Sequence, residues 1–311
     1  MTEYSVKPLV PAATEGNLTE LIAHRAWFEP ERIIMSRPLG DGWQPVTARE
    51  VEAEVRATAK GLVAAGINIG DRVAIMARTR YEWTILDFAI WFAGGCVVPI
   101  YETSSAEQVD WILSDSGAVG LIVETPAHRE FVTPVLPSHT KLIWTMTEDV
   151  LSVLANAGAH IGDDEIDRRR NALLPETLAT LIYTSGTTGK PKGCELTHEG
   201  FVELSRNAQV ELPEVLWEGT STLLFLPMAH VFARFIAVIA IHSGVKVGHQ
   251  PDAKNVAPAM ASFHPNFLLA VPRVFEKVYN SAEQKAEAGG KGKIFRAAAD
   301  AAELTWARVR L

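Results

Sequence analysis

The residues best suited to chemistry lie in residues 181–193, which read Leu-Ile-Tyr-Thr-Ser-Gly-Thr-Thr-Gly-Lys-Pro-Lys-Gly. The apolar residues 178–183 predict a short buried strand, and hydroxyl residues, glycines and lysines follow it at once. The glycines at 186, 189 and 193 allow backbone N–H groups to turn inward, because glycine adopts positive φ without steric cost. This pattern predicts a loop that holds an anion.

The side chains of this loop suit a polyphosphate. Hydroxyl groups donate hydrogen bonds, and lysines supply mobile positive charge. The residues expected to contact phosphate are Thr184, Ser185, Gly186, Thr187, Thr188, Gly189, Lys190 and Lys192.

Two other interpretations of the loop are weaker. A Walker P-loop needs a glycine five positions before its Gly-Lys pair and a hydroxyl residue after the lysine. Those positions hold Thr184 and Pro191, so the pattern fails twice. A glycine- and threonine-rich hairpin loop with incidental lysines is the simpler alternative. The density of donors directly after an apolar strand disfavours it.

Alternating strand and helix signals surround the loop. Asn17, Thr47 and Ser105 each precede a Glu or Gln by three residues, which is typical of a helix start. Those three starts and the apolar periodicity predict helices from 17, at 47–63, 79–93, 105–116, 199–210, 231–242 and 272–285, and within 295–309. Strands are predicted at 33–36 and 43–46 as a hairpin, and at 73–76, 96–100, 119–123, 141–144, 178–183, 222–226, 245–247 and 266–270.

Repeated strand-helix-strand units indicate an α/β fold with layered, parallel-rich sheets wrapped by helices, because parallel strands need helical crossovers. We expect an extended arm at residues 1–16 and a first α/β subdomain at 17–177. Residues 178–311 would hold the loop strand and an incomplete second α/β subdomain. Residues 156–177 carry runs of acidic and arginine residues and are interpreted as a solvated polar connector.

Composition excludes several classes of protein. The 311 residues carry a net charge of −8, which disfavours nucleic acid as a partner. The first residues lack the pattern of a secretory signal, and no apolar run reaches bilayer length. Transient contact with a membrane surface is compatible with this composition. Two cysteines without metal-like spacing fit a reducing compartment, so we expect a cytoplasmic protein.

The loop resembles the phosphate-binding signature of the adenylate-forming enzymes, a superfamily that includes acyl-CoA synthetases. The segments 70–75, 99–103, 227–230 and 271–277 further resemble bacterial long-chain fatty acid CoA ligases. The resemblance implies that a fatty acid attacks ATP with Mg²⁺ present, giving an acyl-adenylate and pyrophosphate, before coenzyme A forms the thioester. Thr184 is then a candidate magnesium contact.

Three residues after the loop, at positions 228–232, complete the expected site. On sequence alone, His230 is either a core histidine or a substrate contact, and the resemblance favours a place beside the acyl-adenylate. Met228 and Phe232 are expected to form an apolar wall of the acyl site. Lys190 and His230 are the expected catalytic residues. Cys194 follows the loop without a basic partner and is interpreted as a packed thiol.

The resemblance also implies that relatives continue for roughly as long again. An aromatic-Gly-x-Thr-Glu segment, a later ribose-binding aspartate and a mobile C-terminal domain with its lysine have no match in this chain. Three hypotheses follow: the N-terminal part of a ligase with little activity alone, a non-catalytic nucleotide- or acyl-binding protein, or half of a split ligase completed by a partner chain.

Overall fold

The computed structural model describes residues 7, 9–12, 16–40, 42–184 and 190–309. The chain forms two compact units, Met1–Leu268 and Leu269–Leu311. The first holds both sheets and the candidate site. No helix in the described ranges is long and apolar enough to cross a membrane.

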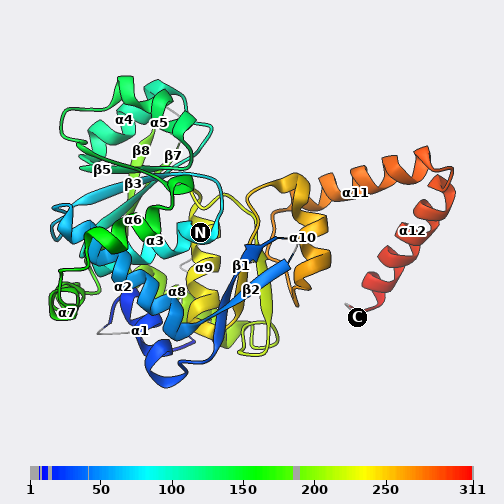
Figure 1. The fold of residues 1–311 in the computed structure, drawn as a ribbon. Helices are drawn as coiled ribbons and strands as arrows, with labels where there is room; N and C mark the ends of the chain where they lie inside the picture. Colours follow the sequence, from blue (N-terminus) through cyan, green and yellow to red (C-terminus); the bar gives the residue numbers. More distant parts are fainter. Residues whose placement is uncertain (1–6, 8, 13–15, 41, 185–189, 310–311) are drawn as a thin grey trace, which may run out of the picture. The chain divides into compact units, whose positions relative to one another are not determined.

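The larger sheet of the first unit has six strands in the order β6-β5-β3-β4-β7-β8 (Figure 1). Its strands are β3 (Arg72–Met76), β4 (Cys96–Ile100), β5 (Gly120–Val123), β6 (Leu142–Thr145), β7 (Leu178–Thr184) and β8 (Lys192–Thr197). The first five run parallel, and β8 pairs with β7 in the antiparallel direction at the sheet edge. The predicted parallel-rich sheet is therefore confirmed.

The smaller sheet has the order β2-β1-β10-β9 and joins distant parts of the chain. Its strands are β1 (Ile33–Leu39), β2 (Gly42–Thr47), β9 (Ser221–Leu224) and β10 (Lys246–His249). The antiparallel β1–β2 pair is the predicted hairpin, and β10 runs parallel to both β1 and β9.

Helices cover both faces of the larger sheet. Figure 1 shows α4 and α5 on one side and α2, α3 and α6 on the other. These helices are α2 (Ala48–Ala64), α3 (Tyr81–Phe92), α4 (Ala106–Ser116), α5 (Pro126–Val132) and α6 (Val150–Ala157). Thr47 and Ser105 form complete capping boxes at the starts of α2 and α4, as predicted from the sequence.

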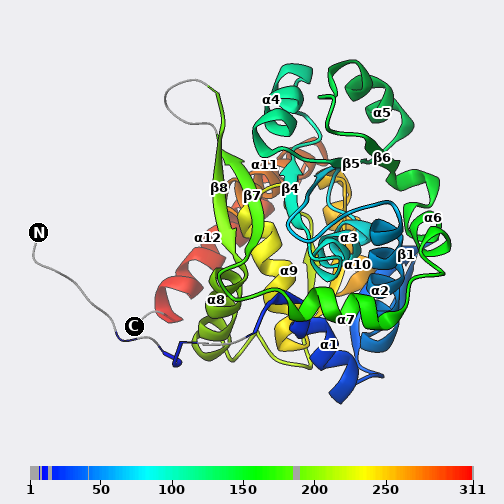
Figure 2. The ribbon, with the colours of Figure 1, turned by 90° about the vertical axis from the view of Figure 1, so that its left-hand side faces the viewer.

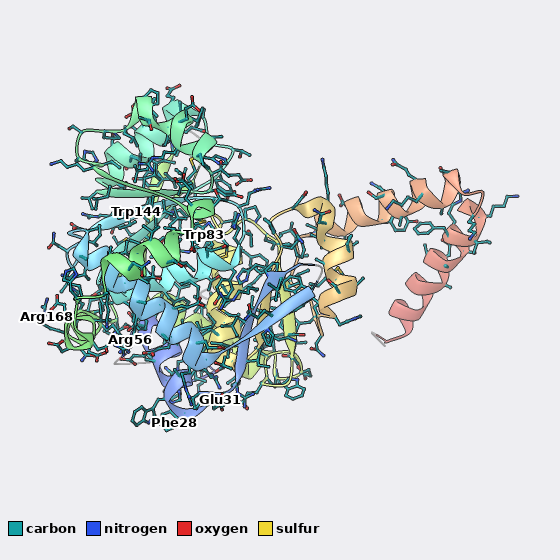
Figure 3. All side chains as sticks on the ribbon, viewed as in Figure 1. Phe28, Glu31, Arg56, Trp83, Trp144 and Arg168 are labelled. Carbon is teal, nitrogen blue, oxygen red and sulfur yellow. The ribbon has the colours of Figure 1, made fainter. Side chains whose placement is uncertain are left out.

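The centre of the unit is built around α3. Its side chains Trp83, Phe88 and Trp91 are almost fully buried, whereas Phe28 and Arg168 lie at the surface (Figure 3). Helices α2 and α6 pack so closely that a Cβ on Gly61 would lie 2.1 Å from the carbonyl oxygen of Leu154. Only glycine permits that approach.

A second helical layer consists of α1 (Leu18–Phe28), α8 (His198–Glu211) and α9 (Val231–Ser243), which contact one another (Figure 2). The remaining helices of the first unit are α7 (Asp163–Asn171), α10 (Val256–Phe263) and three short 3₁₀ turns at Thr133–Val135, Met146–Glu148 and Ala253–Asn255. The second unit holds α11 (Pro272–Ala288) and α12 (Gly292–Val309), in contact through the rings of Tyr279 and Phe295 at 5.2 Å.

The structure corrects two predictions. The supposed solvated connector contains α7, in which Arg169 and Arg170 are buried. Arg169 donates to the carbonyl oxygens of Ile67 and Ala93 at 2.8 and 2.9 Å, so its charge is satisfied without solvent. Residues 266–270 form no strand, because Phe267 makes only one isolated bridge to β9.

Candidate phosphate-binding site

The β7–β8 hairpin holds the predicted loop. Tyr183 pairs with Gly193, and Thr184 pairs with Lys192, so the register brings the two ends of the loop together. Residues 185–189 lie outside the described residues, so the expected contacts Ser185, Gly186, Thr187, Thr188 and Gly189 stay predictions. Thr184 and residues 190–192, here called the loop base, are described.

Helix α4 contacts both sides of the loop base. The hydroxyl of Tyr183 donates to Asp115 Oδ2 at 2.6 Å. The indole N–H of Trp111 donates to the carbonyl oxygen of Pro191 at 2.8 Å. Because Trp111 and Asp115 lie four residues apart, one face of the helix bonds strand β7 and the residue that precedes strand β8. These contacts position the loop base relative to the sheet.

Lys190 lies at the loop base with its ammonium group free of any ion pair among the described residues. Its Nζ lies 4.1 Å from the centroid of the Trp111 ring, and the side chain is exposed. A cation–π contact of this kind is worth about 0.5–1 kcal/mol at an exposed site. The charge is thus held beside the loop by a contact weak enough for an anion to displace.

Tyr183 packs closely against Gly193 in the hairpin. Burial and the neighbouring carboxylate of Asp115 raise the pKa of Tyr183 above its ordinary value, so the ring stays neutral and donates its proton. A Cβ on Gly193 would lie 3.2 Å from the Tyr183 ring. Gly193 lies in strand β8 and is not among the glycines with positive φ, so the turn role expected from the sequence is wrong at this position. The glycine instead permits close packing of the hairpin against Tyr183.

The second group of predicted residues lies at the start of α9. His230 is exposed and caps this helix, its Nδ1 accepting from the backbone N–H of Phe232 at 3.2 Å. The alternative of a core histidine is therefore wrong. Met228 is fully buried, and Phe232 is half-buried. Among the described residues, no hydrogen bond or ion pair joins this group to the loop base.

A buried ion pair connects the two groups indirectly. Arg234, one turn after His230, makes two hydrogen bonds to Asp87 of α3 at 3.0 and 2.5 Å and donates to Thr180 of β7. The Arg234 and Asp87 side chains are 0% and 3% exposed. This contact binds the helix that carries His230 to the strand that leads into the loop.

Sequence reasoning missed this pair, although a signal was present. Asp87 and Arg234 are opposite charges inside two helices that are otherwise strongly apolar. Charges at such positions are rarely buried unless they are paired. A search for opposite charges in apolar helices would have identified both residues.

Cys194 corrects another prediction. It is exposed rather than packed, because β8 is an edge strand whose first four residues are all exposed. Its Sγ lies 3.8 Å from Thr184 Oγ1. The thiol thus lies beside the loop base.

The described residues contain no group of three or more His, Cys, Asp or Glu side chains able to hold a metal ion. Thr184 offers one exposed hydroxyl at the loop base. This donor set suits an ion such as Mg²⁺ that keeps waters and binds largely through substrate phosphates.

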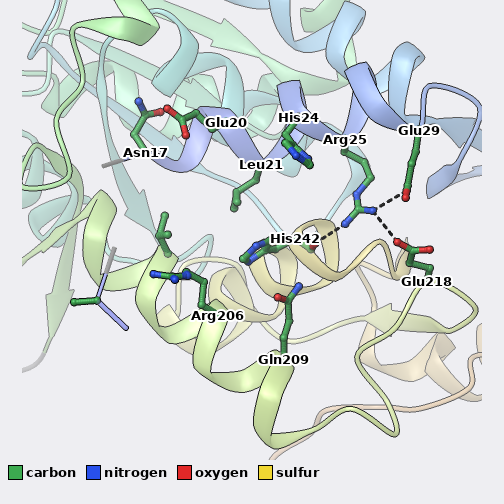
Figure 4. Close-up of a pocket in the computed structure, with 13 residues that line it drawn as sticks. Asn17, Glu20, Leu21, His24, Arg25, Glu29, Arg206, Gln209, Glu218 and His242 are labelled. Atoms are coloured by element: carbon green, nitrogen blue, oxygen red, sulfur yellow. Dashed lines mark hydrogen bonds and ion pairs between the residues drawn. The ribbon is translucent and has the colours of Figure 1, made fainter. Parts of the chain in front are cut away.

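A separate polar hollow lies between α1, α8 and α9 (Figure 4), with a volume of about 770 Å³. Across it, Arg25 bonds Glu29 at 2.7 Å, Glu218 at 3.2 Å and the carbonyl oxygen of His242 at 2.5 Å. None of the predicted site residues lines it.

Comparisons with known proteins identify the family and support the fold. The long-chain fatty acid CoA ligase FadD15 of Mycobacterium bovis is 45% identical over 307 residues, covering 97% of this chain and 51% of the relative. The ligase ACSBG2 of Xenopus laevis is 29% identical over 264 residues, covering 79% and 36%. The chain thus spans about half the length, or less, of these curated relatives.

Solved structures show the same architecture. The N-terminal domain of FACL13 from Mycobacterium tuberculosis has a TM-score of 0.68 at 27% identity, covering 84% of this chain and 64% of that one. VinN has a TM-score of 0.73 at 18% identity, covering 89% and 66%, which supports the fold alone. The model of the AMP-binding enzyme family matches residues 22–309, so this chain belongs to that family.

Proposed function

We propose that this chain supplies the ATP-phosphate-binding part of a long-chain fatty acid CoA ligase. The observation that carries the proposal is the loop base, where Trp111 of α4 contacts Lys190 and Pro191 and the strand register places Lys192 opposite Thr184. The 45% identity to FadD15, a long-chain fatty acid CoA ligase, supports the choice of substrate.

The reaction needs positive charge and donors at the phosphates. A fatty acid carboxylate oxygen attacks the α-phosphorus of ATP, the bond to the bridging oxygen breaks, and pyrophosphate leaves. The coenzyme A thiolate then attacks the acyl carbonyl carbon, and AMP leaves with its phosphate oxygen. Negative charge develops on the phosphoryl oxygens in the first step, so Lys190 and the hydroxyl groups of residues 184–188 would lower that barrier.

The other site residues have supporting parts in this proposal. Lys192 adds a second positive charge, and Thr184 is the proposed contact for Mg²⁺, which would offset phosphate charge when bound with ATP. His230 contacts the acyl-adenylate at the start of α9. Met228 and Phe232 form the apolar wall for the fatty acid.

We also propose the division of the chain into subdomains that the sequence predicts. In this proposal, residues 17–177 hold the first α/β subdomain and residues 178–311 the loop strand with part of the second, and strands from both ranges pair within each sheet. The β1–β2 hairpin contributes strands to the sheet of β9 and β10. We further propose a cytoplasmic location. If the ligase is split, a partner chain carries the remaining family motifs.

The reaction is tested by palmitate-dependent exchange of labelled pyrophosphate into ATP, with the 311-residue chain. This assay reports the adenylation step alone. The test variant is Lys190→Ala at the loop base. The control variant is Lys141→Ala, at an exposed lysine elsewhere in the chain. Acetate in place of palmitate tests the preference for a long chain.

Each outcome has a distinct meaning. Palmitate-dependent exchange that Lys190→Ala abolishes and Lys141→Ala preserves shows that the chain adenylates alone. A folded chain that binds MgATP without exchange supplies the phosphate site only, and a second chain restoring exchange identifies a split ligase. A folded chain with neither exchange nor MgATP binding contradicts the proposal.

A further inference from the structure

A cavity of about 600 Å³ in the first unit is lined by none of the predicted site residues. It is formed where the smaller sheet meets the start of α3 and the segment that follows β6. Its lining includes Arg37, Arg80, Tyr81, Met146, Val150 and His249. The described residues of the loop base and the start of α9 are not among them.

His249 lines this cavity, and one of its two ring nitrogens has no hydrogen-bond partner among the described residues. It is only 1% exposed, and its Nε2 lies 2.9 Å from the hydroxyl of Thr84. Its Nδ1 has no hydrogen-bond partner among the described residues. Buried polar atoms are nearly always paired, so an unpaired one beside a cavity indicates a missing ligand or water.

Arg37 presents a second unpaired donor next to His249. Ser36 of β1 pairs with Gly248 of β10 in parallel register, so the following residues, Arg37 and His249, are neighbours on one face of the sheet. One terminal nitrogen of Arg37 donates to Glu54 at 2.8 Å. Its buried Nε, in contrast, has no partner in the described part of the chain.

The ring of Tyr81 holds these two side chains in place. The Arg37 guanidinium lies 5.0 Å from the ring centroid, and the His249 ring meets Tyr81 edge-on at 6.3 Å. The Tyr81 hydroxyl donates to Glu54 at 2.7 Å. The two side chains are thus held by contacts among two strands, β1 and β10, and two helices, α2 and α3.

The protonation of His249 sets what the cavity can bind. Burial lowers the pKa of His249 to about 4, so its ring is neutral at neutral pH and carries one N–H. If the Thr84 hydroxyl donates to Nε2, the proton is on Nδ1, which is then a donor.

Besides Arg37, the charged side chains of the lining are Arg80, Glu82 and Asp149. Arg80 makes two hydrogen bonds to Glu82 at 3.1 and 3.0 Å, which satisfies both side chains. Asp149 is an exposed carboxylate at the rim. The apolar side chains of Met146 and Val150, both almost fully buried, also line the cavity. The unmet hydrogen-bonding capacity therefore lies with Arg37 and His249.

We propose that this cavity binds a small organic anion whose carboxylate or phosphate oxygens accept hydrogen bonds from Arg37 Nε and His249 Nδ1. The apolar part of the anion packs against Met146 and Val150. This site is separate from the ATP-phosphate site and does not depend on the function proposed above.

The test is an NMR titration of the histidine side-chain nitrogens in the 311-residue chain. The probes are butyrate, inorganic phosphate and neutral butyramide. Nδ1 of His249 should resonate as a protonated nitrogen, and butyrate or phosphate should shift it saturably, whereas butyramide should not. A shift with butyrate alone assigns a carboxylate, and one with phosphate alone assigns a phosphate group.

Variants test the two donors. Arg37→Met and His249→Phe should each weaken probe binding about tenfold or more, because each removes a hydrogen bond to a charged group. Arg168→Met, at an exposed arginine of α7, should leave it unchanged. If a variant does not fold, the titration of the unaltered chain decides alone.

The proposal is overturned if neither anion shifts the His249 nitrogens, or if butyramide shifts them as strongly as butyrate. MgATP binding, measured in the same samples, reports on the phosphate loop independently. If the chain binds MgATP but does not bind the anions, the proposal for this cavity fails and the proposed function stands.

Discussion

At the scale of single residues, Trp111 makes the two contacts that hold the loop base. Its ring lies under Lys190, and its indole N–H bonds the Pro191 carbonyl. The sequence indicated Lys190 from the local pattern, because the glycines and hydroxyls lie beside it. Trp111 lies about 80 residues away in the chain, so no local pattern could indicate it.

Trp111→Phe tests the hydrogen bond, because it keeps an aromatic ring under Lys190 and removes only the N–H donor. The lost bond should cost about 0.5–1.5 kcal/mol and should weaken MgATP binding severalfold by loosening the loop base. Calorimetric titration with MgATP measures the effect. Trp27→Phe, at a residue 80% exposed, is the control and should bind MgATP as the unaltered chain does.

Gly193→Ala tests the close fit beneath the loop. The new methyl group would lie 3.2 Å from the Tyr183 ring, which itself is fixed by Asp115, so we expect a loss of about 1–3 kcal/mol in unfolding free energy. Urea denaturation measures it. Gly42→Ala, where the nearest atom lies 3.8 Å away, should lose clearly less. Equal losses in both variants would show that crowding of Tyr183 is unimportant.

At the scale of helices and strands, elements with local end signals were predictable, and those stabilised by distant partners were not. The caps at Thr47 and Ser105 gave correct helix starts. Helix α7 was missed because its arginines resemble a solvated run, yet Arg169 is buried against two carbonyl oxygens from other elements. Strand β8 was missed because an exposed edge strand lacks an apolar run.

The Arg234–Asp87 pair between α9 and α3 makes a prediction at this scale. Arg234→Met should cost about 3–5 kcal/mol of unfolding free energy, because it leaves Asp87 buried without its partner. The double variant Arg234→Met with Asp87→Leu should recover most of that loss. Denaturant titration of the three proteins gives the comparison. A double variant as unstable as the single one would show that packing, rather than the unpaired charge, causes the loss.

At the scale of the whole molecule, buried histidines predict how stability depends on pH. Burial lowers the pKa values of His198, His242 and His249 from 6.5 to about 4. Between these pH values the unfolded chain binds more protons than the folded chain, so stability is complete above about pH 6.5 and falls as the pH drops towards 4. Each histidine contributes a slope of about 1.4 kcal/mol per pH unit.

Urea denaturation at several pH values measures this slope. His198→Asn keeps an acceptor for the backbone N–H of Leu18 but cannot gain a proton. It should therefore reduce the slope of unfolding free energy against pH by about 1.4 kcal/mol per pH unit. His160→Asn, at an exposed histidine, should leave the slope unchanged. An unchanged slope in His198→Asn would contradict the assignment of these buried groups.

The fold class was predictable over the whole first unit, because parallel strands and their crossover helices leave a regular pattern in the sequence. The site was predictable only where its residues adjoin in the chain. The pairing of β1 with β10 brings residues about 210 apart into one sheet, and no sequence period marks it.

The most direct test of the account is calorimetric measurement of MgATP binding to the 311-residue chain, its Lys190→Ala variant and the Lys141→Ala control. The account predicts that the unaltered chain and the control bind MgATP alike. Lys190→Ala should bind about tenfold to a hundredfold more weakly, because a charged contact to phosphate is lost. Equal affinity in all three proteins, with the fold intact, would contradict the assignment of this loop as the ATP-phosphate site.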